Sequence, residues 1–218
     1  MELKGLKVAF LGDSLTQGIG ASAREGSYPS VFSEITEIAE GWNYGISGTR
    51  IARQSVPFRG CSDWDRDFLS RVEQIDERAD CVVVCGSTND YMHGDASLGC
   101  FDDRSVYTFY GAMHALLDKL KSRLPDAKII FMTPPRFVEE ESPSMAHIDK
   151  GHYFSEYISA IREVCAHHSV TVFDLHLAPE LDPRDAEKKQ RYYSDTVHLN
   201  DNGYRVVAER LKEFIMGL

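Results

Sequence analysis

Short apolar runs alternate along the chain with longer segments in which apolar residues recur at helical spacing. The short runs stop at Gly, Pro or polar residues and predict buried β-strands over residues 7–12, 41–47, 81–86, 128–133 and 170–175. The longer segments predict amphipathic helices over residues 27–40, 105–124, 153–168 and 202–218. Because "CVVVCG" is apolar throughout, it is typical of a central parallel strand that is covered on both faces.

Five strands separated by helices predict one doubly wound α/β domain with a parallel sheet. No internal repeat, low-complexity tract or linker divides residues 1–218, so we expect a single domain. In such sheets, ligands bind beyond the carboxyl ends of the strands. The segments that follow the strands are therefore the place to look for chemistry.

Composition narrows the function classes. The formal net charge is -10 and no Lys/Arg-rich run interrupts it, which argues against nucleic acid and anionic membranes as partners. The first apolar run ends at Gly12 and Asp13, too early for a secretory signal. Five cysteines form an odd set without CxxC or metal-ligand spacing. We expect a cytoplasmic, reduced protein with no metal or other cofactor, in which Cys81 and Cys85 are small buried thiols.

Residues suited to acyl transfer follow the predicted strands. "GDSLTQG" follows the first strand, "SGTR" the second, "GSTND" the third, and "YYSDTVHLN" lies beyond the fifth. These segments bring five candidates to one rim of the sheet: Ser14, Gly48, Asn89, Asp195 and His198. A serine hydroxyl becomes a useful nucleophile when an imidazole removes its proton, and a carboxylate orients that imidazole. Backbone N–H groups and an Asn amide can stabilise the oxyanion.

These four blocks, in this order, resemble those of the SGNH hydrolases, the GDSL-type esterase/lipase superfamily. The resemblance spans nearly the whole chain and implies a flavodoxin-like three-layer α/β/α sandwich. It implies that Ser14 is the nucleophile and an oxyanion N–H donor, and that Gly48 and Asn89 are further donors. It also implies that His198 is the general base and Asp195 its orienting carboxylate.

The third block departs from the family pattern. The family usually has Gly-X-Asn-Asp there, but Ser87 stands at the glycine position, one place after Gly86. If the turn requires a positive φ, a serine is strained at that position. Asn89 and Asp90 keep the expected residue types.

Each candidate also has an ordinary structural explanation. Ser14 can cap a helix, Gly48 can be a turn glycine, Asn89 can be a loop former, and Asp195 or Asn200 can cap the last helix. Residue types suited to acyl transfer follow several separate strands, and this combination favours a catalytic site. A strand followed by a small-residue loop also suits a non-hydrolytic nucleotide- or flavin-binding module. A hydrolase scaffold used only for protein interaction is a third alternative.

The expected substrate is a small-molecule ester. The segments expected to wall the site, residues 50–65, 91–104 and 136–151, are polar, with scattered apolar side chains at Phe58, Trp64, Phe101 and Met145. A long acyl chain requires a continuous apolar trench. We therefore expect short acyl groups, acetyl to butyryl, on a carbohydrate or another polar alcohol. The structural alternative is that these apolar side chains anchor the long loops to the domain and do not contact substrate. His93 and His152 lie on predicted loops near the rim, where contact with substrate is a further hypothesis.

Overall fold

The computed structural model describes residues 1–143 and 151–218. Its centre is a parallel five-stranded sheet in the order β2-β1-β3-β4-β5. The strands are β1 (Lys7–Gly12), β2 (Glu40–Gly45), β3 (Cys81–Cys85), β4 (Lys128–Met132) and β5 (Thr171–Phe173). This is the strand order of flavodoxin-like sheets, so the expected fold is confirmed.

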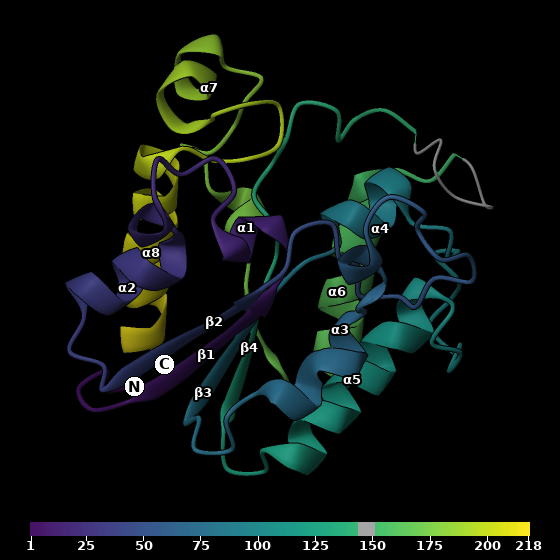
Figure 1. The fold of residues 1–218 in the computed structure, drawn as a ribbon, viewed down its shortest axis with the longest axis horizontal. Helices are drawn as coiled ribbons and strands as arrows, with labels where there is room; N and C mark the ends of the chain where they lie inside the picture. The colour runs from purple at the N-terminus through teal and green to yellow at the C-terminus, as the bar shows by residue number, and fades with distance from the viewer. Residues whose placement is uncertain (144–150) are drawn as a thin grey trace.

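Helices cover both faces of the sheet (Figure 1). On one face lie α2 (Tyr28–Ile35) and α8 (Asp201–Met216), which pack against each other. On the other face lie α3 (Phe68–Arg71), α5 (Phe109–Arg123) and α6 (Phe154–His167). The two helical layers and the sheet between them make the three-layer sandwich.

Side chains alternate between the two faces along each central strand. In β1, Ala9 and Leu11 join the core under α5 and α6, whereas Val8 and Phe10 join the core under α2 and α8. All four side chains are fully buried, as the continuous apolar pattern predicts for a strand covered on both sides. In β3, Cys81 and Cys85 are buried free thiols, as expected.

Capping side chains set where two of the predicted helices begin. The helix predicted over residues 105–124 begins at Phe109, because the Thr108 side chain accepts a hydrogen bond from the N–H of Gly111. Asn200 caps α8 in the same way, accepting from the N–H groups of Asn202 and Gly203. The capping role considered for Asn200 is therefore confirmed.

Four short helices were absent from the sequence-based prediction. They are α1 (Ser14–Gln17), α3, α4 (Thr88–His93) and α7 (Ala186–Tyr192). Segments of four to seven residues are too short to show a hydrophobic period. Two of them, α1 and α4, begin directly beyond the carboxyl ends of β1 and β3, where the candidate site lies. In the described part of the chain, no helix is long and apolar enough to cross a bilayer.

Candidate active site

Ser14 is the first residue of α1, immediately beyond the end of β1. Asp13 caps this helix: its Oδ1 accepts a hydrogen bond from the N–H of Leu15 at 3.0 Å. The tight passage from strand to helix requires Gly12, because a Cβ there would lie 1.9 Å from Oγ1 of Thr16. As the first helical residue, Ser14 has a backbone N–H with no partner inside the helix. The hydroxyl and the backbone N–H of Ser14 therefore both lie just beyond the carboxyl end of β1.

Asp195 and His198 lie on a tight loop closed by pairing of Tyr193 with Leu199. Oδ1 of Asp195 accepts hydrogen bonds from the N–H groups of Val197 at 2.7 Å and His198 at 2.6 Å. This local turn places the carboxylate beside the imidazole, which explains the three-residue spacing.

A continuous hydrogen-bonded chain joins three of the five candidates. Nε2 of His198 lies 3.0 Å from Oγ of Ser14, and Nδ1 lies 2.7 Å from Oδ2 of Asp195. Burial alone would raise the pKa of Asp195, but hydrogen bonds from the His198 N–H, the imidazole and the Val197 N–H outweigh it and lower the pKa. The carboxylate is thus ionised at neutral pH and holds the Nδ1 proton, which leaves the Nε2 lone pair facing the serine.

Asn89 lies on α4, and both ends of its amide are held in place. Nδ2 donates to the carbonyl oxygen of Thr49 at 3.0 Å and lies 3.5 Å from Oδ2 of Asp13. Oδ1 lies 2.8 Å from Nε2 of His93, one helical turn further along. These contacts connect the amide to the segment that contains Gly48 and to the residue before Ser14. The structure thereby brings Asn89 into the same site.

Gly48 occupies a position that only glycine fits. Its φ is +77°, and a Cβ would lie 2.3 Å from the indole ring of Trp64. The neighbouring side chain of Arg50, itself buried, donates to the Gly48 carbonyl at 2.9 Å. The indole and the guanidinium together fix the turn on two sides.

Ser87 has the strained backbone that its position in the third block predicts. Its φ is +123°, in the region that favours glycine, and it immediately precedes α4. Its hydroxyl is buried and has no hydrogen-bond partner among the described residues. The strain leaves Asn89 correctly placed, because α4 still starts at Thr88.

Three buried charged residues hold the site together, and of these only Arg71 lies outside the sequence blocks that follow the strands. Asp90 accepts hydrogen bonds from the N–H groups of Ile51 and Ala52, and burial raises its pKa to about 7. Burial likewise raises the pKa of Asp13 to about 6. Arg71, from α3, donates to the carbonyl oxygens at the ends of β1 and β2, and burial lowers its pKa to about 10.

Aromatic side chains cover one side of the site. Phe58 stacks on Trp64 with ring centroids 4.3 Å apart, and Trp64 stacks on His93 at 5.6 Å. His93 thus has a role as the partner of Asn89 that the sequence did not predict. His152 instead pairs with Glu156 at the start of α6.

Phe101, one of the apolar side chains expected near the substrate, lies away from the candidate site. Phe101 packs against Tyr110, His114 and His167 on the α5–α6 side, so it anchors its loop. This was the structural alternative considered for it. Met145 lies outside the described residues, as does part of the segment 136–151.

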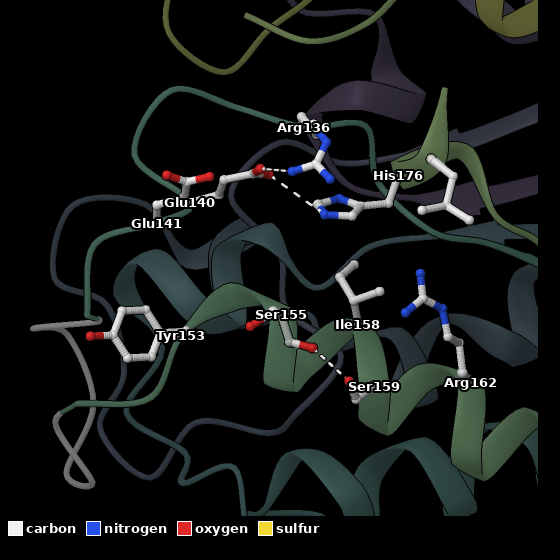
Figure 2. Close-up of a pocket in the computed structure, with 10 residues that line it drawn as sticks. Arg136, Glu140, Glu141, Tyr153, Ser155, Ile158, Ser159, Arg162 and His176 are labelled. Atoms are coloured by element: carbon white, nitrogen blue, oxygen red, sulfur yellow. Dashed lines mark hydrogen bonds and ion pairs between the residues drawn. The ribbon is translucent and has the colours of Figure 1, made fainter. Parts of the chain in front are cut away.

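A pocket of about 470 Å³ lies elsewhere, between α6 and the segment after β4 (Figure 2). Its arginines are already paired, Arg136 with Glu140 and Arg162 with Asp174. Neither Ser14 nor His198 lines it. The pocket therefore does not define the candidate active site.

The arrangement suits acyl transfer better than nucleotide binding. It combines a hydroxyl, an imidazole and a carboxylate in hydrogen-bond contact with amide donors nearby. For a nucleotide or flavin phosphate, α1 has only four residues, and a buried carboxylate caps its N-terminus. The non-hydrolytic alternative has no support from the site.

Comparisons with known proteins agree with this geometry. The GDSL-like lipase/acylhydrolase family model matches residues 10–206. A protein of known structure from Lactobacillus plantarum is 27% identical, with a TM-score of 0.82 over 99% of each chain. An acetyl xylan esterase is 26% identical, with a TM-score of 0.64 over 96% of this chain and 100% of its own.

A lipase/acylhydrolase from Enterococcus faecalis shares the fold at 21% identity, with a TM-score of 0.66 over 97% of this chain and 96% of its own. No curated protein matches the sequence. The family match covers most of the chain, including the serine, glycine, asparagine, aspartate and histidine described above. The chain therefore belongs to the GDSL-like lipase/acylhydrolase family and is a hydrolase of ester bonds.

Proposed function

We propose that the protein hydrolyses carboxylic esters through an acyl-enzyme on Ser14. The observation that carries this proposal is the hydrogen-bonded chain from Ser14 through His198 to Asp195. Oγ of Ser14 attacks the acyl carbon while Nε2 of His198 takes its proton. The imidazolium, stabilised by Asp195, then protonates the departing alcohol. Water activated by the same imidazole releases the acid and restores the serine.

The oxyanion is stabilised by three donors: the N–H groups of Ser14 and Gly48, and Nδ2 of Asn89. The amide of Asn89 has two N–H bonds, and Thr49 uses one of them. The other makes only a long contact of 3.5 Å to Oδ2 of Asp13, which an oxyanion would replace as negative charge develops on the substrate oxygen. Because His93 fixes Oδ1, the donor end of the amide stays directed into the site.

Replacement of the nucleophile tests this mechanism. Ser14→Ala is expected to lower kcat by roughly 10⁴- to 10⁶-fold, since the remaining residues cannot form the acyl-enzyme. The fold is retained, because the change removes one hydroxyl at the rim of the sheet. A fluorophosphonate probe followed by peptide mass spectrometry checks the same point directly, with the adduct expected on Ser14.

Ser30→Ala, in α2, is the matched serine control and keeps full activity. Wild-type turnover by Ser14→Ala, or an adduct on another residue, would show that the nucleophile lies elsewhere.

For the substrate, we propose short acyl groups, acetyl to butyryl, carried by a carbohydrate or another polar alcohol. The stack of Phe58, Trp64 and His93 offers a flat face beside Gly48, and Phe58 is partly exposed. The surrounding segment carries charged residues such as Asp63 and Arg66 rather than a continuous apolar trench. The acetyl xylan esterase among the structural relatives supports the same class of substrate.

A series of p-nitrophenyl esters with two to twelve acyl carbons tests the acyl preference. We expect kcat/KM to be highest for two to four carbons, because longer chains would gain about 0.8 kcal/mol per CH₂ only where an apolar wall removes them from water. A maximum at eight carbons or more would contradict the proposal.

The alcohol preference is tested with acetylated xylo-oligosaccharides. Phe58→Ala is expected to lower kcat/KM for this substrate roughly two- to tenfold and to leave p-nitrophenyl acetate unaffected. Val56→Ala, exposed on the same segment, is the control. Equal losses on both substrates would mean that Phe58 only supports the loop.

A further inference from the structure

Three histidines meet between α5 and α6, and none of them belongs to the proposed triad. His114 lies on α5, His167 is the last residue of α6, and His168 follows it. One ring nitrogen from each lies within 4.8 Å of the other two. His114 is buried, His168 is partly buried and His167 is exposed, so the cluster opens to solvent on one side.

The contacts of this cluster bring a ring nitrogen of His114 close to a ring nitrogen of His168. Nε2 of His114 lies 3.0 Å from the carbonyl oxygen of Phe101, and Nδ1 of His168 lies 3.3 Å from Oδ1 of Asp118. A carbonyl only accepts, so Nε2 of a neutral His114 carries the proton and Nδ1 is a lone pair. The inner nitrogens, Nδ1 of His114 and Nε2 of His168, lie 2.8 Å apart. In the His168 tautomer that carries its proton on Nδ1, beside Asp118, both inner nitrogens are lone pairs.

In that tautomer, a positive charge between or beside the two lone pairs stabilises the contact. A proton would serve one pair of imidazoles and would give His167 no part in the cluster. A transition-metal ion accepts lone pairs from all three rings. With zinc–nitrogen distances of about 2.0–2.1 Å, an ion bound to both inner nitrogens would have an N–Zn–N angle of nearly 90°. An increase of roughly half an ångström in the distance between the two nitrogens would open this angle to the tetrahedral value.

The outward partners are those that metal-binding histidines normally have. Ligating imidazoles usually donate their other N–H to a carboxylate or a backbone carbonyl, which fixes the tautomer and the ring orientation. Asp118 and the Phe101 carbonyl occupy these two positions. Phe101 also packs edge-on against His114 and His167, so the rings are held on a further side.

We propose that His114, His167 and His168 bind a divalent transition-metal ion such as Zn²⁺. Nδ1 of His114 and Nε2 of His168 are two of the ligands, and the exposed His167 supplies a third from the solvent side. Water completes the coordination. The ion would connect the end of α6 to α5 and, through Phe101, to the loop that precedes α5, and it therefore has a stabilising role separate from ester hydrolysis.

Metal titration of tag-free protein, stripped with a chelator, tests the proposal. We expect one Zn²⁺ per chain by isothermal titration calorimetry and a rise in Tm on addition of Zn²⁺, because an ion that binds only the folded state stabilises it. Co²⁺ is expected to give visible absorption bands from nitrogen coordination.

His167→Gln is the most informative variant, because His167 is the exposed member of the cluster and its replacement removes one ligand while the buried His114 stays in place. It is expected to weaken Zn²⁺ binding at least tenfold, as is His168→Gln. Asp118→Ala, which removes only an outward partner, is expected to weaken binding roughly ten- to hundredfold. His152→Gln, at the other end of α6, is the control and retains full binding.

Absence of saturable Zn²⁺ and Co²⁺ binding by the wild type would overturn the proposal. So would binding that His167→Gln and His168→Gln leave unchanged, because the ion would then occupy another site.

Discussion

At the scale of single residues, hydrogen-bond partners determine which way each side chain of the site can act. Asn89 shows this most clearly, since His93 holds its oxygen and Thr49 takes one of its two amide protons. Asn89→Ala is expected to lower kcat by roughly 10²- to 10³-fold with little change in KM, because we propose that the second amide proton leaves its long contact with Asp13 for the oxyanion as charge develops. Steady-state kinetics on a short-chain ester measures both parameters.

A raised KM with unchanged kcat would instead make Asn89 a ground-state binder. His93→Phe is the companion variant, because it can keep the stack on Trp64 while it removes the hydrogen bond to Asn89. A fall in kcat with KM unchanged would identify His93 as a positioning residue, whereas a purely structural role would leave the kinetics intact.

Asp13 makes folding stability depend on pH. Burial raises its pKa from 3.8 to about 6, so the folded protein binds this proton more tightly than the unfolded chain does. Stability from this group is therefore lost as the pH rises from 3.8 to about 6. Asp13→Asn keeps a capping oxygen but cannot ionise. The variant is expected to gain stability relative to the wild type through this window, by at most about 3 kcal/mol.

Urea denaturation at pH 4 and pH 8 measures this divergence. Asp185→Asn, at the exposed N-cap of α7, is the control and is expected to show a much smaller change. A constant difference between Asp13→Asn and the wild type at both pH values would contradict the pKa shift.

At the scale of elements, the site depends on short turns that fit their neighbours closely. Gly48 has a φ of +77° and lies directly under Trp64. Gly5 has a similar φ of +79° but has open space where a Cβ would be, so the two glycines separate backbone strain from crowding. Gly5→Ala is expected to cost about 1–2 kcal/mol from φ alone.

Gly48→Ala is expected to cost about 1–3 kcal/mol more than Gly5→Ala, because the methyl group also displaces the indole. It should lower kcat/KM on the order of 10- to 100-fold, since the N–H at position 48 moves. Chemical denaturation and ester hydrolysis of both variants give these values. Equal stability losses, or full activity of Gly48→Ala, would mean that the indole adapts without effect on the site.

At the scale of the whole molecule, the parallel sheet gathers residues from distant parts of the chain. Ser14 follows β1, Gly48 follows β2 and Asn89 follows β3, and these strands are neighbours in the order β2-β1-β3. The histidine comes from beyond β5, at the far edge of the sheet, and reaches Ser14 through the loop before α8. That residues 1–218 form one domain stays a prediction, as does a cytoplasmic location.

The sequence by itself determined the sheet, its main helices and the candidate residues that the structure brings together. Buried strands and amphipathic helices have periods that show in the local pattern, and the residues of the site follow strands whose carboxyl ends must share one edge. The Asp195/His198 pair could also be identified, because its contact is local. The positive φ of Ser87 was predictable from the residue type that it replaces.

Only the tertiary structure decided the contacts between residues far apart in the chain. The partnership of Trp64 with Gly48, the three carbonyl and hydroxyl bonds of Arg71, and the anchoring of Phe101 away from the substrate all depend on how helices pack. The histidine cluster is the clearest case, since His114 and His168 are separated along the chain and show no ligand spacing. Local patterns record burial and turn geometry, whereas partners across the core are set by packing alone.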